Sequence, residues 1–272
     1  MPKNKSWFRF EAKAGEDATT IYIYDEISAW GVTAKDFIAE LRKVSAKTIH
    51  LRLNSPGGDV FDGITIYNAL REHAATVKVQ VDGLAASIAS IIAMAGDEIR
   101  MAKNSFMMIH FAWAWAAGNA TEMRKLADTL DKIDTTLVTT YQDKTGASQR
   151  DIRQMMADET WMSADEALAN GFADAVGDVA EINARFDLSK FSRVPQAVAA
   201  MNTMGAPEPA TEREIEKTLR DAGVSKKAAL AAVAAIKGET LRDAGGEENA
   251  KGFADFLKAQ TETIKVQTLL SI

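Results

Sequence analysis

Three strand-like segments recur at nearly equal intervals, and this spacing constrains the fold more than any other feature of the chain. They begin at Ile49, Val77 and Phe106, 28 and 29 residues apart, and helical patterns fill the intervals. The pair Asp82-Gly83 is expected to end the second strand, and a helix of small residues follows it. Repeated strand–helix units of this length predict an α/β fold with helices packed against parallel strands.

The composition fits one good-sized domain with appendages. The chain has 272 residues, of which 47% are hydrophobic and 26% charged, as in an ordinary soluble globular protein. Its net charge of -6 argues against a nucleic-acid-binding surface over the whole chain. The longest apolar stretch, residues 85–95, is about half a membrane span, and the N-terminus lacks the apolar core of a signal peptide. We therefore expect a cytoplasmic protein with no membrane and no nucleic-acid partner.

Two residue counts limit the catalytic and metal-binding residues that the chain can use. The chain has no cysteine, which excludes disulfides, thiolate metal sites and a cysteine nucleophile. It has three histidines, so a mechanism that needs an imidazole must use His50, His73 or His110. We expect no metal and no cofactor.

Changes in sequence pattern divide the chain into four parts. Strand and helix signals run through residues 21–185, which we interpret as one domain after an N-terminal segment, 1–20. Three of the five prolines lie between positions 195 and 209, which predicts a linker over residues 186–210. Helix-capping patterns beyond it predict a mostly helical C-terminal extension, 211–272.

Three short segments could carry chemistry. Residues 54–58, Asn-Ser-Pro-Gly-Gly, contain two glycines that let the backbone approach a ligand and leave N–H groups free for an anion. Residues 83–87, Gly-Leu-Ala-Ala-Ser, place Ser87 in the first turn of a helix, where an oxyanion would be stabilised. His110 ends an apolar strand. Taken singly, the three are also explained by a tight turn, a closely packed helix and a core histidine.

Together and in this order, the three segments resemble the proteolytic subunit of Clp protease. That family has an Asn-Ser-Pro-Gly-Gly turn, a Gly-x-Ala-Ala-Ser nucleophile segment and a Met-Ile-His base, and the likeness covers about residues 21–179. It implies an α/β fold of the ClpP/crotonase type, a spiral of β-β-α units with a projecting handle helix. Residues 120–141 match that helix, although their pattern alone also suits a helix lying on its own core. The resemblance further implies a homo-oligomeric ring.

The resemblance also implies the catalytic roles. Ser87 would be the nucleophile and His110 its general base, giving acyl transfer through an acyl-enzyme. The backbone N–H groups of Ile88 and of the Gly57-Gly58 turn would form the oxyanion hole.

The third catalytic member departs from the family pattern. The family aspartate lies four residues before the serine that opens a Ser-Ala-x-Glu-Ala helix, and here that serine is Ser163. Four residues before it is Glu159, with Asp158 as the alternative acid. A carboxylate of either length can hold the imidazole tautomer, although both residues could equally be solvent-exposed acids that cap a helix.

Two further departures resemble the Clp-related head maturation proteases of tailed bacteriophages. Residues 111–115, Phe-Ala-Trp-Ala-Trp, replace a Gln-Pro and glycine-rich stretch, and would either reshape the cleft or a subunit contact or pack into the core. More than 90 residues follow Val179, and residues 219–225 resemble the extension of those proteases. This likeness implies an ATP-independent endopeptidase that processes scaffold proteins, capsid proteins and itself in the assembling procapsid.

Besides a general Clp-type protease, three other functions remain open at this point. A signal-peptide-peptidase-like enzyme shares the Ser-Pro-Gly-Gly turn but uses a Ser-Lys pair. An acyl-CoA hydratase or isomerase shares the wider crotonase architecture without the Ser-His pair. A non-catalytic capsid assembly or scaffold module would retain only the protease-like fold.

Overall fold

The computed structural model describes residues 6–12, 17–27, 33–178 and 186–203, and all structural statements below concern these residues. The predicted helical extension, 211–272, lies outside them.

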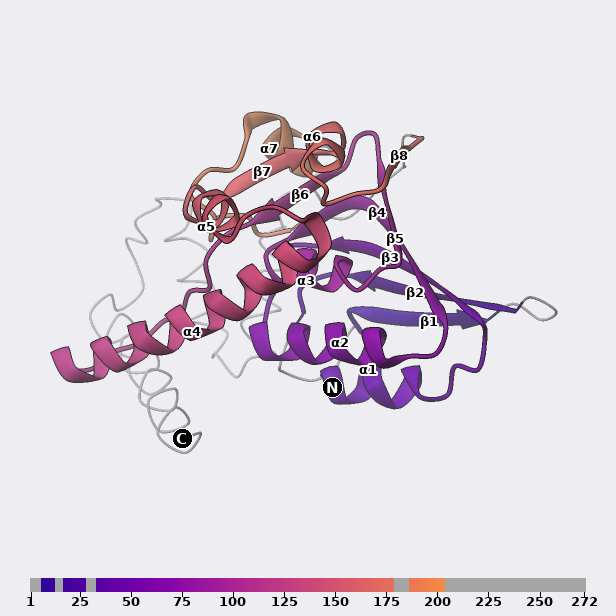
Figure 1. Ribbon diagram of the computed structural model, residues 1–272, viewed down its shortest axis with the longest axis horizontal. Coiled ribbons are helices and arrows are strands. Elements are labelled where there is room, and N and C mark those ends of the chain that lie inside the picture. Colours follow the sequence, from indigo (N-terminus) through magenta and orange to yellow (C-terminus); the bar gives the residue numbers. More distant parts are fainter. Residues whose placement is uncertain (1–5, 13–16, 28–32, 179–185, 204–272) are drawn as a thin grey trace, which may run out of the picture. The chain divides into compact units, whose positions relative to one another are not determined.

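An eight-stranded mixed sheet forms the centre of the described domain (Figure 1). The strands of its main path are, in spatial order, β1 (Phe8–Ala12), β2 (Ala18–Tyr24), β3 (Thr48–Ser55), β4 (Thr76–Ala86), β5 (Glu98–Ala102) and β8 (Ala175–Gly177). From β2 to β8 the pairs are parallel, and β1 is antiparallel to β2. The predicted α/β fold with parallel strands is therefore confirmed.

The long strand β4 belongs to two groups of strands. Its residues Lys78–Val81 pair with β5, whereas Leu84–Ala86 pair with β6 (Phe106–Ile109). β6 in turn pairs antiparallel with β7 (Thr160–Ser163). The strand therefore continues through Asp82-Gly83, where the sequence pattern predicted its end, and what changes there is the neighbouring strand.

Helices cover this framework, and they are α1 (Ala34–Leu41), α2 (Val60–Glu72), α3 (Ile88–Ala93), α4 (Ala120–Thr145), α5 (Gln149–Ala157), α6 (Ala164–Ala169) and α7 (Gln196–Thr203). Helices α1 and α2 pack side by side, and α2 also contacts α3 (Figure 1). Their buried residues join the sheet residues Ile49, Leu51 and Leu53 in one apolar core. Among the described helices, none combines the length and the apolar character needed to cross a membrane.

Helix α4 begins at a capping box and projects from the domain. Asn119 and Glu122 form the capping box, and Gly146 ends the helix with a left-handed φ of 72°. Its fully buried residues, Asp134, Leu137, Val138 and Tyr141, all lie in the second half. Figure 1 shows the first half extending away from the sheet, as a handle helix does.

Residues 186–203, which the sequence assigned to a linker, pack on the domain instead. We call them the strap. Leu188, Phe191 and Val198 are buried in a second apolar cluster with Leu84, Ala86 and Met108. Pro195 accepts the first backbone hydrogen bond of α7 at its carbonyl, so it marks a helix start, a position that proline tolerates.

The two tryptophans after His110 do not lie in the core. The side chains of Trp113 and Trp115 are 48% and 91% exposed, and their rings contact each other edge to face. The alternative that the two tryptophans pack into the core is thereby excluded, although Phe111 and Ala112 are partly buried against it.

Candidate active site

Ser87 lies between the end of β4 and the start of α3 in a rarely populated backbone conformation. Its φ is 56° and its ψ is -129°, a region where a non-glycine residue costs about 1–3 kcal/mol. The amide of Ser87 donates to the Met108 carbonyl over 2.9 Å, and the Ser87 carbonyl accepts from the Ser90 amide and hydroxyl. The buried hydroxyl of Tyr141 contacts the Ser90 hydroxyl at 2.8 Å. These contacts hold Ser87 in its strained turn.

His110 follows β6 and meets Ser87 because β4 and β6 are neighbours. The Ser87 Oγ and His110 Nε2 atoms are 2.8 Å apart. The chain after His110 is held by the buried Asp134, whose carboxylate accepts from the Ala112 amide over 2.8 Å. Burial lowers the pKa of His110 from its ordinary value, Glu159 opposes this through its negative charge, and Lys190 reinforces it. A neutral imidazole with its proton on Nδ1 can take the Ser87 proton at Nε2.

The two glycines of the 54–58 turn lie against different parts of the chain, Gly57 against Ser87 and Gly58 against Ile27. Gly57 has a φ of 93°, and an added Cβ would lie 2.7 Å from the Ser87 Cβ and 3.1 Å from the Ile88 nitrogen. Only a glycine therefore allows this approach to the serine. The Gly57 amide donates to Ser55 Oγ, and its carbonyl accepts from the Ile27 amide.

The amides of Gly58 and Ile88 are the remaining candidates for an oxyanion hole. Neither N–H has a hydrogen-bond acceptor within the part of the chain that the structure describes. Ile88 is the first residue of α3, so its N–H has no acceptor inside the helix. Gly58, with a φ of 145°, is fixed by the bridge to Ile27, where an added Cβ would collide with the Ile27 carbonyl at 1.9 Å.

Glu159 lies close enough for its charge to act on His110, but its carboxylate and that of Asp158 bond to other groups. Glu159 accepts from the amides of Ser192 and Arg193 over 2.9 and 2.6 Å, and from Trp161 Nε1 over 3.3 Å. Asp158 accepts from the Arg193 guanidinium over 3.1 Å. Among the described residues, no hydrogen bond or ion pair joins either carboxylate to His110. The structure thus brings Ser87 and His110 together but leaves the Glu159 carboxylate bonded to other groups.

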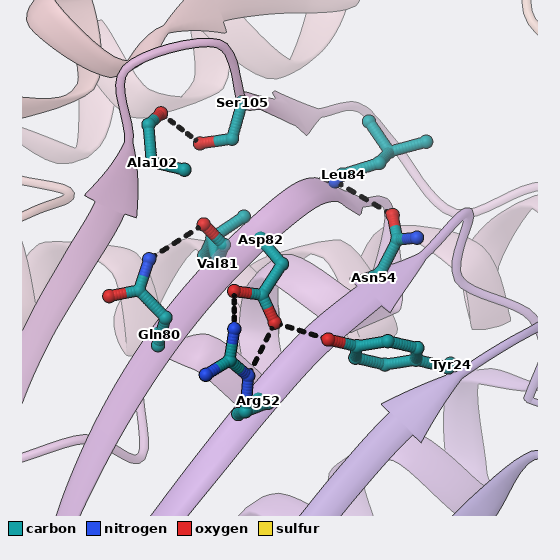
Figure 2. A network of polar contacts seen from close by, with 9 residues as sticks. All are labelled: Tyr24, Arg52, Asn54, Gln80, Val81, Asp82, Leu84, Ala102 and Ser105. Carbon is teal, nitrogen blue, oxygen red and sulfur yellow. Dashed lines mark hydrogen bonds and ion pairs between the residues drawn. The ribbon is translucent and has the colours of Figure 1, made fainter. Parts of the chain in front are cut away.

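A polar network fixes the bend of β4 that leads to Ser87 (Figure 2). The Asp82 carboxylate is 3% exposed and binds Arg52 through two hydrogen bonds, of 2.5 and 2.9 Å, and the Tyr24 hydroxyl through a third. Burial and the contact with Asp82 raise the pKa of Tyr24 to about 12. The Asn54 side-chain oxygen accepts from the Leu84 amide over 3.1 Å, close to the point where the β3–β4 register shifts.

The sequence analysis did not identify this network as part of the site. The signal was present, since a charged residue inside an apolar strand requires a partner, and Arg52 on the adjacent strand supplies one. Within the described part of the chain, no group of three or more histidine, aspartate or glutamate residues could hold a metal ion.

Comparisons with known proteins agree with this architecture. The family model described as Clp protease matches residues 13–180. The proteolytic subunit of the ATP-dependent Clp protease of Deinococcus radiodurans is 34% identical over 151 residues, 53% of this chain and 74% of that protein. The corresponding subunit of Streptococcus suis is 34% identical over 153 residues, covering 53% and 78%. That of Leuconostoc citreum is 35% identical over 154 residues, covering 53% and 76%.

Proposed function

The chain belongs to the Clp protease family, and on this premise we propose that it is a serine endopeptidase with Ser87 as nucleophile and His110 as general base. The observation that carries the proposal is the 2.8 Å contact between Ser87 Oγ and His110 Nε2. It joins a hydroxyl at a helix N-terminus to an imidazole whose pKa is lowered by burial. A Ser-Lys mechanism is disfavoured, because the group bonded to the Ser87 hydroxyl is an imidazole.

The proposed reaction is acyl transfer. His110 Nε2 accepts the Ser87 proton while Oγ attacks the carbonyl carbon of a peptide bond. The oxyanion lies between the amides of Gly58 and Ile88, and Gly57 permits their approach to Ser87. His110 then gives its proton to the leaving amine, and a water molecule, deprotonated by His110, hydrolyses the acyl-enzyme.

We assign Glu159 as the third catalytic member, ahead of Asp158. Its negative charge already favours the protonated form of His110, and it occupies the position where the family has an aspartate. Asp158 is paired with Arg193 and remains the alternative acid. A Glu159 carboxylate bonded to Nδ1 would stabilise the imidazolium that forms during the reaction.

For the biological role, we propose head maturation of a tailed bacteriophage, without ATP. The exposed Trp113 and Trp115 stand where the family has a glycine-rich stretch, and the strap continues beyond the region that matches the family. The substrates would be scaffold and capsid proteins and the chain itself, in a procapsid in the host cytoplasm. Several copies would form a ring, with α4 as the contact helix. The relatives are named as subunits of ATP-dependent proteases, so a protease supplied by an ATPase is the rival function.

Co-expression with the capsid protein encoded by the same genome tests this proposal. We expect a shortened capsid protein with the wild type and none with Ser87→Ala, as measured by intact-protein mass spectrometry. The purified pair should give the same product without ATP. Identical processing by Ser87→Ala would contradict the proposal, and a strict requirement for ATP and an unfoldase would favour the rival.

A further inference from the structure

The strap lies against the candidate catalytic residues, although it is outside the family-matched residues 13–180. The ring of Phe191 is 7% exposed and meets the His110 imidazole edge to face, with 5.6 Å between ring centroids. It meets the Trp161 indole in the same way at 5.5 Å. The strap therefore covers one side of the general base.

The strap also binds the candidate acid. The Ser192 and Arg193 amides donate to different oxygens of Glu159, and the Arg193 guanidinium donates to the carbonyl and the carboxylate of Asp158. Glu159 has a φ of 48°, a left-handed conformation that costs a non-glycine residue free energy and that these bonds help to hold. Both oxygens of the carboxylate are thus engaged by the strap.

The strap also carries a positive charge that acts on the general base. Lys190 is anchored by Glu26, with 2.7 Å between Nζ and Oε1, and its charge opposes protonation of His110. The burial of His110, to which Phe191 contributes, and the charge of Lys190 disfavour the imidazolium that acyl transfer requires, and the bonds to the strap keep Glu159 from bonding to the imidazole. These three features of residues 190–193 therefore act in the same direction.

We propose that the strap, residues 186–203, is an autoinhibitory segment that keeps Glu159 away from His110 until it is displaced. This inference concerns the regulation of the proposed peptidase site and rests on that proposed function. Displacement removes the strap's hydrogen bonds from both oxygens of Glu159, of which Oε1 keeps Trp161 as a partner, and removes Lys190 and Phe191 from the general base. The closed state is held by the apolar side chains of the strap and by the Lys190–Glu26 pair, while two hydrogen bonds between Phe186 and Asn202 join the two ends of the strap to each other.

The test measures how fast a fluorophosphonate acylates Ser87 in the full-length chain and its variants. Phe191→Ala should increase the rate about tenfold or more, because truncating a buried aromatic side chain weakens the closed state by over an order of magnitude. Glu26→Gln removes only the surface anchor and should increase the rate about threefold. The matched control is Glu40→Gln, which breaks an exposed pair with Lys43 of 2.6 Å on α1 and should leave the rate unchanged.

A second readout separates autoinhibition from a merely structural role. Glu159→Gln should reduce the acylation rate by a smaller factor in the wild type, where the strap holds the carboxylate, than in the Phe191→Ala background. In the Phe191→Ala background the same change should reduce the rate about tenfold or more, because the freed acid then acts on His110. If the strap has only a structural role, Glu159→Gln should change the acylation rate by the same factor in both backgrounds.

The outcomes distinguish a failure of the autoinhibition proposal from a failure of the peptidase proposal. Unchanged or slower acylation in both Phe191→Ala and Glu26→Gln, with Glu26→Gln keeping the wild-type thermal unfolding curve, overturns autoinhibition and leaves the peptidase proposal intact. Failure of the wild type and every variant to label at Ser87 overturns the peptidase proposal, and the inference with it.

Discussion

Substitution of Gly57 by alanine tests whether the close approach of the Gly-Gly turn to Ser87 makes the site reactive. With a φ of 93°, the new Cβ would lie 2.7 Å from both the Ala86 carbonyl oxygen and the Ser87 Cβ. The Ile88 nitrogen would be 3.1 Å away. None of these atoms belongs to the far end of a flexible side chain, so either the turn or Ser87 must move.

The required movement sets the expected loss of activity. Carbon atoms pack at about 3.5 Å, so the turn and Ser87 must separate by about 0.8 Å. A misplacement of about 1 Å costs about 10²-fold in rate, and loss of one oxyanion donor costs about 10²–10³-fold. We expect kcat on a fluorogenic peptide to fall about 10²-fold, or about 2.7 kcal/mol in activation free energy. The free energy of unfolding should fall by about 2 kcal/mol because of the positive φ.

Gly146→Ala is the matched control. Gly146 has a φ of 72°, but an added Cβ there would meet nothing within 4 Å. It should lower the free energy of unfolding by about 1 kcal/mol, measured by urea denaturation, and leave kcat unchanged. The reasoning is refuted if Gly57→Ala retains kcat within threefold of the wild type, with the active serine quantified by titration.

Two further outcomes are expected. The value of kcat/KM should rise with pH through an apparent pKa below 6.5, because burial lowers the pKa of His110. Only neutral imidazole can accept the serine proton, so activity appears as His110 loses its proton. A midpoint above 7 in the pH profile would contradict this. Arg52→Met leaves the buried Asp82 carboxylate without its cation and should lower the free energy of unfolding by about 3 kcal/mol in urea denaturation. The control Arg71→Met breaks the half-exposed ion pair between Arg71 and Asp97 and should lower the free energy of unfolding by less than about 1 kcal/mol. Equal losses of unfolding free energy in the two variants would refute the role given to the bend of β4.

The sequence was most informative where function depends on local geometry. The Gly-Gly turn, Ser87 and His110 each follow a strand, and parallel pairing of those strands brings their ends together. Residue type and order therefore predicted the contact between Ser87 and His110.

Long-range partners could not be predicted in the same way. Asp82 was predicted to lie at the end of the strand because no partner for its charge is visible in the neighbouring sequence. Its partners, Arg52 and Tyr24, lie 30 and 58 residues away, and local propensity carries no information about them. The position of Glu159 depends on amides 33 and 34 residues further along, in a segment whose prolines indicated a linker. Pro195 instead starts a helix that packs on the domain, and only the apolar Leu188, Phe191 and Val198 could have suggested this.

The most direct test of the central claim is to locate the fluorophosphonate adduct by peptide mass spectrometry of the labelled full-length chain. The Ser87–His110 geometry predicts one adduct, on Ser87, whose rate of formation falls at least about 10³-fold in His110→Ala. Labelling of another residue, or equal labelling of Ser87 in His110→Ala, would show that the pair is not the reaction centre.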